Sequence, residues 1–226
     1  MSAGEIYTAV TAPSYGVRAL TKAEYAHEWI RERILSGEFQ PGMALDPEAL
    51  SSRLGVSTTP LREAVRRLET EQLVSTAAHR HVYVAPLEYE TLAEVFVVRL
   101  ETEPLASRLA TAAASDSELQ AIAELVDNPP AADDALTLLR YNGAIHRQIY
   151  RASHNTVLIR VLDQLSDLVD RYRALAFRRD PGVSTAHRNH SEIIAALIAR
   201  DGDLASRLMR DHVSYGFERM RKQEGA

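Results

Sequence analysis

Residues 46–69 read DPEALSSRLGVSTTPLREAVRRLE, and this run contains two successive sets of helix boundary signals. An aspartate cap, a first-turn proline and a first-turn glutamate open a short helix, and Gly55 ends it. A second helix opens with the cap Ser57 and an early proline, and its apolar positions continue to about Glu71. Two short helices joined by a tight turn that contains glycine are typical of a helix-turn-helix.

The segments on either side of this run complete a small domain. A helix opens at Thr21 and ends near Gly37, with apolar residues at three- and four-residue spacing. After the helix-turn-helix the period changes, and the alternating or β-branched stretches 73–76 and 82–84 predict a two-stranded hairpin, which is a wing. Pro86 cannot continue a strand ladder, so we place a domain boundary there.

Helical patterns fill the rest of the chain. Asp116 and Asp203 read as helix N-caps, and Gly202 reads as a helix stop. Because everything beyond the wing has helical periodicity, we expect these helices to pack as one bundle. The expected helices cover residues 91–114, 116–126, 133–152, 155–177, 185–200 and 203–222.

Composition supports a folded, helical chain of two domains. The chain has 226 residues, of which 46% are hydrophobic and only 6% aromatic, and β-branched runs are scarce. We therefore expect a mainly α protein, with an N-terminal winged helix-turn-helix followed by an all-helical bundle of about six helices. The expected divisions are a mobile tail at 1–18, the winged helix-turn-helix at 19–86 and the helical domain at 90–222.

Charge, cysteine content and apolar runs exclude several classes of protein. The net charge is −5, so nucleic-acid binding must depend on local placement of charge rather than on bulk charge. The chain has no cysteine, which excludes disulfides and thiolate metal sites. The longest apolar run, Ile193 to Ala199, is far shorter than a membrane span. We expect a cytoplasmic protein with no membrane partner.

Arginines gather on the second helix of the helix-turn-helix. Arg62 and Arg66 lie four residues apart on one face, away from the apolar stripe, and Arg67 lies beside them. Arginine on this face reaches phosphates or guanine edges in the major groove. The alternative is a solvated face with ion pairs such as Glu63 with Arg67. The short helices and the hairpin favour DNA binding.

Histidines form a second constellation, in the helical half. Asn142 and His146 are four residues apart and leave the same side of one helix, while His190 and His212 lie on two later helices. Imidazole nitrogens suit zinc, nickel, copper or iron, and helical bundles build metal sites from side chains that point inward. The alternative is that these histidines are ordinary core or surface residues, and spacing alone leaves both interpretations open.

The first half resembles the winged helix-turn-helix of GntR-type bacterial transcription regulators. The match covers residues 19–86, and it implies that the helix-turn-helix and wing bind an operator. Thr58 departs from the family pattern, because many relatives carry an arginine there, and a family glycine is absent near His81. The motifs that carry the resemblance are ILSG at 34–37, PG at 41–42, the segment 49–57 and TPLREAVRRLE at 59–69. The residues expected at DNA are Arg53, Ser57, Thr58, Thr59, Arg62, Arg66, His79 and Arg80.

The second half resembles the FadR-type ligand-binding helical domain, known as the FCD domain. The resemblance implies a homodimer whose metal is held by three histidines and an Asp or Asn. Here the implied ligands are Asn142, His146, His190 and His212, with zinc as the first candidate and nickel as the second. His187 is a rival ligand. The segments that carry the match are Arg99 with EPLA at 103–106, Asn142 with His146, ASHN at 152–155, His190 and His212.

The same resemblance implies a small organic acid as effector. In family members the open metal positions and a nearby arginine accept a carboxylate, so Arg99 is the candidate second anchor. Its alternative role is an ion pair with Glu103 across one helical turn. Because an Asn142 amide adds no charge, the site keeps the full dipositive charge of its metal, which attracts anions and weakens retention of the metal.

Together these features predict a DNA-binding transcription regulator, by expectation a repressor, and not an enzyme. One alternative is a metal-dependent hydrolase or lyase built on a helical bundle, because such a metal can activate water. The nearest acids in sequence to the predicted ligands, Glu192 and Asp211, point away from those ligands, and the winged helix would stay unexplained. Another alternative is a metal-stabilised architectural DNA protein that has no effector.

Overall fold

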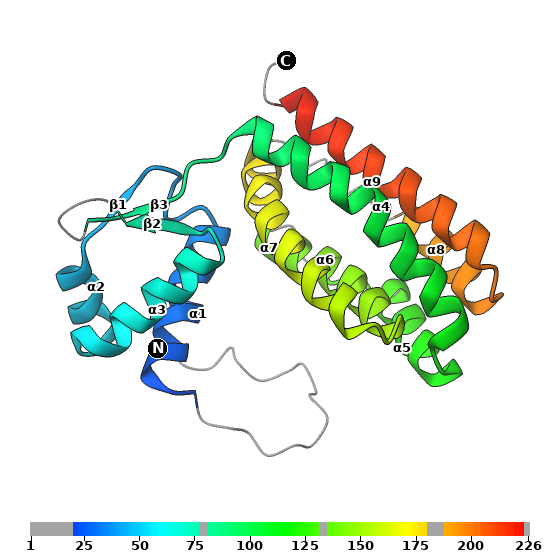
Figure 1. Ribbon diagram of the computed structural model, residues 1–226, viewed down its shortest axis with the longest axis horizontal. Coiled ribbons are helices and arrows are strands. Elements are labelled where there is room, and N and C mark those ends of the chain that lie inside the picture. The colour runs from blue at the N-terminus through cyan, green and yellow to red at the C-terminus, as the bar shows by residue number, and fades with distance from the viewer. Residues whose placement is uncertain (1–19, 77–80, 132–134, 180–187, 224–226) are drawn as a thin grey trace.

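The computed structural model of the chain describes residues 20–76, 81–131, 135–179 and 188–223, which form two groups of elements (Figure 1). The first group contains α1 (Lys22–Leu35), β1 (Ala44–Leu45), α2 (Pro47–Leu54), α3 (Thr58–Thr70), β2 (Val74–Thr76) and β3 (Val82–Val84). The second contains α4 (Tyr89–Ala113), α5 (Asp116–Asp127), α6 (Ala135–Ala152), α7 (Thr156–Arg179), α8 (Arg188–Ile198) and α9 (Gly202–Gln223). The expected fold class, a winged helix-turn-helix followed by a helical bundle, is confirmed.

Local signals start and end the first helices as expected. Thr21 and Glu24 form a reciprocal capping box at the start of α1. The Asp46 side chain accepts a hydrogen bond from the backbone N–H of Glu48 at 2.9 Å, which opens α2. Gly55 ends α2 in the left-handed conformation, at φ 63°, where a side chain would be strained. The local sequence therefore specifies the turn between α2 and α3.

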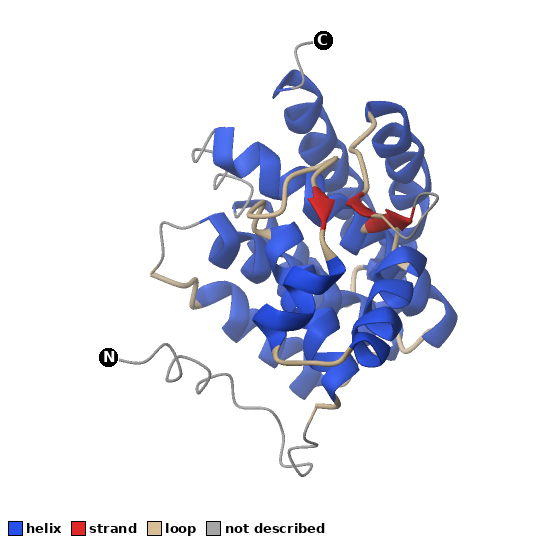
Figure 2. Cartoon of the chain, turned by 90° about the vertical axis from the view of Figure 1, so that its left-hand side faces the viewer, coloured by secondary structure: helices blue, strands red, loops and turns tan. Residues whose placement is uncertain are grey.

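The small sheet has one strand more than the predicted hairpin. β3 lies in the middle of the antiparallel order β1-β3-β2, with Val74 of β2 opposite Val84 and Ala44 of β1 opposite Tyr83. Figure 2 shows the strands together beside the surrounding helices. The two residues of β1 are too few to carry a strand pattern, and only their pairing with β3 defines them as a strand. The expected contact residues His79 and Arg80 at the wing tip lie outside the described residues, as does the expected tail 1–18.

Each group of elements buries its own hydrophobic cluster. The long helices α4 and α9 lie side by side in the second group (Figure 1). None of the helices in the described ranges is long and apolar enough to cross a membrane. The first cluster includes Ile30, Leu61, Leu68 and Leu73, and the second includes Phe96, Ile145, Ile193 and Met209.

Two expected helix caps are wrong by one or two residues. Ser115, not Asp116, caps α5 in a capping box, and Asp116 lies in the first turn. At the start of α9, the side chain of Asp201 accepts the backbone N–H of Leu204 at 2.9 Å, and Asp203 lies in the first turn. In both places a residue just before the expected acid, Ser115 or Asp201, makes the capping contact. The acids still contribute, because negative charge in a first turn favours the helix dipole.

The predicted stop at Gly202 is also wrong, since this glycine begins α9. The left-handed residue after α8 is Arg200, at φ 58°. A Cβ at position 202 would lie 2.9 Å from the Thr111 hydroxyl, so the glycine allows α9 to approach α4 closely. Glycine at position 202 serves tertiary packing rather than helix termination. Local sequence does not reveal this role.

Candidate metal centre and DNA-facing helix

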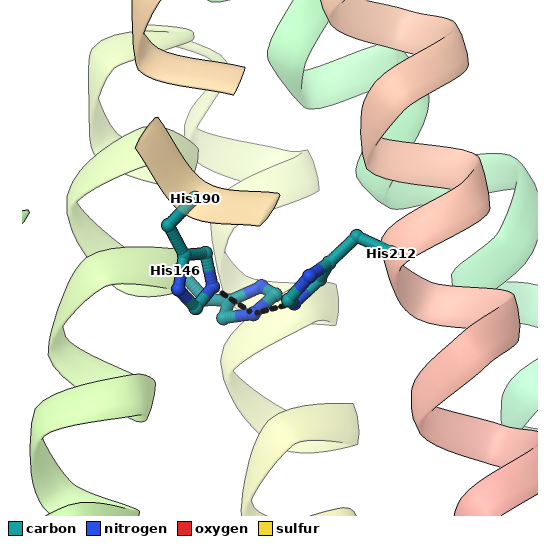
Figure 3. Close-up of side chains that lie close together, drawn as sticks. All are labelled: His146, His190 and His212. Carbon is teal, nitrogen blue, oxygen red and sulfur yellow. Dashed lines mark hydrogen bonds between the residues drawn. The ribbon is translucent and has the colours of Figure 1, made fainter. Parts of the chain in front are cut away.

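Three buried histidines converge inside the bundle. His146 on α6, His190 on α8 and His212 on α9 point toward one another in Figure 3. The Nε2 atom of His146 lies 3.0 Å from Nε2 of His212 and 3.3 Å from Nε2 of His190. Tetrahedral zinc with ligand distances of about 2.0–2.1 Å would hold its ligand atoms about 3.3 Å apart. These two distances are close to that value, and ligand atoms of all three histidines lie within 4.8 Å of one another, so the cluster could hold one transition-metal ion.

A carboxylate orients the first of these histidines. Glu103 of α4 is fully buried, and its Oε2 lies 2.8 Å from Nδ1 of His146. Burial alone would raise the pKa of Glu103, but Arg99 and His146 together hold that pKa well below its usual range. An ionised carboxylate only accepts hydrogen bonds, so Nδ1 of His146 donates and its Nε2 keeps a free lone pair. This is the tautomer that a metal ligand requires.

The protonation states of His146 and His212 suit the same role. Burial lowers the pKa of His146 below the ordinary histidine value, although Glu103 opposes that shift. Burial also lowers the pKa of His212, further than that of His146, and the charges of His146, Arg173 and Arg99 add to the effect. Imidazoles that stay neutral offer lone pairs, which is the form that binds a metal.

The fourth predicted ligand, Asn142, is also buried, with 7% of its surface exposed. It lies one turn before His146 on α6, so both side chains leave the same side of the helix. Its part in metal binding stays a prediction. The rival His187 lies outside the described residues.

Arg99, the predicted effector anchor, adopts the alternative contact that the sequence offered. Its guanidinium is fully buried, and its Nε donates to Oε1 of Glu103 at 2.5 Å. Across the described part of the chain, Nη1 of Arg99 finds no hydrogen-bond acceptor. The ion pair with Glu103 therefore leaves one end of the guanidinium without an acceptor, beside His146, which Glu103 also contacts.

Two residues near the histidines were missed at the sequence level. The Tyr150 hydroxyl lies 3.4 Å from Nδ1 of His146, one turn along α6, a spacing that the sequence could have signalled. Burial raises the pKa of Tyr150 far above its ordinary value, so it stays a neutral hydroxyl. The charge of Arg173 on α7 contributes to lowering the pKa of His212, and its side chain is 14% exposed and contacts Asp170 at 3.4 Å. No motif or spacing relates Arg173 to the histidines.

The outer face of α3 carries the arginines that were predicted to read DNA. Arg62 and Arg66 are exposed, and neither has an ion-pair partner among the residues described. Arg67 instead pairs with Glu63 at 2.5 Å, as the alternative interpretation expected for that residue. Among the described residues, Arg62 and Arg66 thus have no ion-pair partner, whereas Arg67 is paired with Glu63.

The other predicted DNA-binding residues surround the start of α3. Ser57, Thr58 and Thr59 are exposed at the N-terminus of this helix, where backbone N–H groups and the helix dipole favour phosphate. Arg53 at the end of α2 is exposed and contacts Glu38 at 3.4 Å. These placements are compatible with a DNA backbone crossing the start of α3.

Comparisons with known proteins agree over both halves of the chain. Residues 22–84 match the family model described as bacterial regulatory proteins, gntR family, and residues 94–215 match the FCD domain model. The HTH-type transcriptional repressor GlaR of Escherichia coli K12 is 30% identical over 198 residues, covering 83% of this chain and 90% of that protein. The Glc operon transcriptional activator of the same strain is 27% identical over 216 residues, covering 84% and 85%.

A solved structure shows the same architecture. Escherichia coli McbR/YncC superposes on this chain with a TM-score of 0.81 and 22% identity, covering 92% of this chain and all of the other. At this identity the likeness concerns the fold, namely the winged helix-turn-helix followed by the helical domain.

Proposed function

Because the chain belongs to the GntR family of bacterial regulatory proteins and carries an FCD domain, we propose that a small organic acid controls its binding to operator DNA. The protein is a transcriptional regulator, and its relatives include a named repressor and a named activator. We propose that this protein represses transcription, because its relative GlaR is a transcriptional repressor. A homodimer would place two copies of α3 on the halves of a pseudo-palindromic operator.

The observation that carries the proposal is the convergence of three buried imidazoles in front of a buried carboxylate. His146, His190 and His212 would hold a divalent transition metal, with zinc as the first candidate and Asn142 as the fourth ligand. When bound, such a cation supplies positive charge and open coordination positions for an anion. Glu103 keeps the lone pair of His146 Nε2 directed at this point.

The arginine beside the site supports a carboxylate as the effector. Arg99 is held by Glu103 through Nε, while its Nη1 has no acceptor in the described ranges. A guanidinium with spare donors in a buried site recognises a carboxylate through directional hydrogen bonds. We therefore propose that Arg99 donates to a carboxylate of the effector, which the histidine site holds by another oxygen.

Control of DNA binding then requires two arrangements of the chain. We propose that residues 19–86 form the DNA-binding domain and residues 90–222 the effector domain, joined through the segment at Pro86. An acid that binds one arrangement of the helical domain more tightly shifts the population toward it. A small rotation of the helical domain, transmitted at this segment, would change how the two α3 helices of a dimer meet DNA.

The contacts of Glu103 argue against the hydrolase or lyase alternative. A general base needs a carboxylate oxygen free to accept a proton from water near the metal. Among the described residues, Glu103 is the acid that contacts the histidine cluster, and its Oε1 pairs with Arg99 while its Oε2 contacts His146. Both oxygens therefore serve to position other side chains.

The proposal is tested with full-length protein and an operator that the protein itself selects from random duplexes. A panel of small mono-, di- and tricarboxylates is added to zinc-loaded and to chelator-treated protein. We expect at least one acid to change the operator Kd by about 5–150-fold in the zinc-loaded protein only. An unchanged operator Kd at saturation, for every acid that calorimetry shows to bind, would refute this mechanism.

The exposed arginines of α3 give a prediction that concerns the DNA-binding face alone. Arg62→Ala and Arg66→Ala should each weaken operator binding by about 1–3 kcal/mol, because each removes a phosphate or base contact. Arg67→Ala is the matched control, since Arg67 already pairs with Glu63, and it should change the Kd by less than about twofold. Fluorescence anisotropy with labelled operator measures all three. Full affinity in the first two variants would remove these arginines from the DNA interface.

A further inference from the structure

A chain of charged side chains links the end of α3 to the helical domain. Glu71, the C-cap residue of α3, has Oε1 at 2.7 Å from His27 Nε2 and Oε2 at 3.8 Å from Arg31 Nε, both on α1. The Nη2 of Arg31 also pairs with Oδ1 of Asp167 on α7. Figure 1 shows α7 on the side of the bundle that faces the first group of elements. The contact therefore crosses between the two groups.

The chain continues on the bundle side toward the histidine cluster. Arg147, which directly follows the predicted ligand His146, donates from Nη2 to Asp167 at 2.9 Å and to Asp170 at 3.2 Å. Oδ1 of Asp170 lies 3.4 Å from Nη1 of Arg173. Asp167 is thus shared by two guanidinium groups, one from each side of the junction. We call the set the interdomain relay, and it consists of Glu71, Arg31, Asp167, Arg147, Asp170 and Arg173.

We propose that the interdomain relay transmits occupancy of the histidine site to the end of the DNA-facing helix α3. The inference rests on the proposed function for the ligand that occupies the site. Because His146 and Arg147 are consecutive on α6, we expect a shift of this helix at His146 to move Arg147 as well. Because Arg147 and Arg31 share Asp167, a move of Arg147 changes how strongly Arg31 is held, and Arg31 contacts the residue that ends α3.

The partial burial of these pairs makes them effective couplers. The side chains of Arg31, Asp167 and Arg147 are only 23–26% exposed, so solvent and salt screen them less than surface pairs. A fully exposed pair would contribute little to coupling. These side chains can also exchange ion-pair partners without a change in backbone secondary structure. Such exchange suits a transition between two arrangements of the domains.

A separate contact fixes the same junction without carboxylates. Arg171 of α7 is 6% exposed, and its guanidinium donates to the backbone carbonyls of Gln72, at 2.9 Å, and of Ala85. Gln72 lies just after the end of α3, and Ala85 lies just after the end of β3. Arg171 therefore serves as a pivot, while the interdomain relay beside it carries the pairs that can rearrange.

The test uses zinc alone as the ligand and hydrogen exchange of residues 69–76 as the readout. In wild-type full-length protein, saturating zinc should slow exchange at the end of α3 by about threefold or more, because it fixes α6 and hence Arg147. In Asp167→Asn, which keeps the side-chain shape but removes the charge, zinc should bind with the same stoichiometry and leave this exchange rate unchanged. The double variant Arg31→Gln/Asp167→Asn should behave as Asp167→Asn does, because one link is already broken.

Arg140→Gln is the matched control. It breaks the pair between Arg140 and Glu32, which also crosses the junction but is 57% exposed on the arginine side, and among the described residues Arg140 forms no ion pair with Asp167. The response of residues 69–76 to zinc should survive in this variant. An equal response in wild type and Asp167→Asn would overturn the interdomain relay and leave the metal site standing. Failure of wild-type protein to bind zinc would instead overturn the proposed site and the relay with it.

Discussion

Glu103→Ala is expected to lower the free energy of unfolding of metal-free protein by about 3–5 kcal/mol, the loss typical when a buried ion pair loses one partner. The variant leaves the guanidinium of Arg99, which is fully buried, without its carboxylate, and it removes the acceptor for Nδ1 of His146. Chemical denaturation in the presence of a chelator measures the effect without a contribution from metal binding.

Two further variants test whether burial of the charge causes this loss of unfolding free energy. Glu101→Ala removes a carboxylate two residues earlier on α4, but Glu101 is 72% exposed and pairs with Arg210 on the surface. Its effect should stay within about 0.5 kcal/mol. The double variant Arg99→Met/Glu103→Leu removes both buried charges and should cost much less than Glu103→Ala. A loss below about 1 kcal/mol in Glu103→Ala would contradict a buried charge network at this site.

His146→Ala is expected to abolish the metal content of the protein, from about one divalent ion per chain to near zero. Loss of a residue that merely orients a ligand weakens metal affinity by about 10–100-fold, and loss of a ligand should exceed this. Of the three histidines, His146 has its Nε2 within 3.3 Å of both other Nε2 atoms. Elemental analysis of untagged protein after incubation with zinc measures the change.

The control for this experiment is His154→Ala. His154 is about half exposed and pairs with Glu118 at 2.9 Å, away from the buried cluster, so its loss should leave the metal content unchanged. His190→Ala should lose metal as His146→Ala does, while the protein still dimerises by gel filtration. Undiminished metal in both variants would place the ion at other ligands and refute the site.

Local sequence predicted the helix-turn-helix well because its boundaries are set by short-range effects. The Asp46 cap and the left-handed Gly55 act within one turn of the chain, and the structure contains both. The same kind of reasoning failed at Gly202. That glycine serves a close contact with Thr111, which is 91 positions earlier in the chain, so no neighbouring residue signals its role.

The candidate site divides in the same way. The spacing of Asn142 and His146 places them on one side of a helix, and the family resemblance named His190 and His212 as their partners. Spacing alone favoured ordinary histidines, and only the resemblance favoured a metal site. The convergence of Nε2 atoms from α6, α8 and α9 depends on how three helices pack. Glu103 also acquires its second partner, His146, only through that packing.

The sequence by itself determined the helices, the winged helix-turn-helix and the arginine face of α3, because caps, turns and periodicity act over a few residues, while the family resemblance supplied the candidate ligands. Only the structure decided that Arg67 pairs with Glu63 while Arg62 and Arg66 have no ion-pair partner in the described part of the chain, and that Glu103, the partner of Arg99, also contacts His146. It also decided that Asp167 joins Arg31 to Arg147. The contacts of Glu103 with His146 and of Asp167 with Arg31 and Arg147 join residues on different helices, and their strength depends on burial, which arises only when the helices pack together.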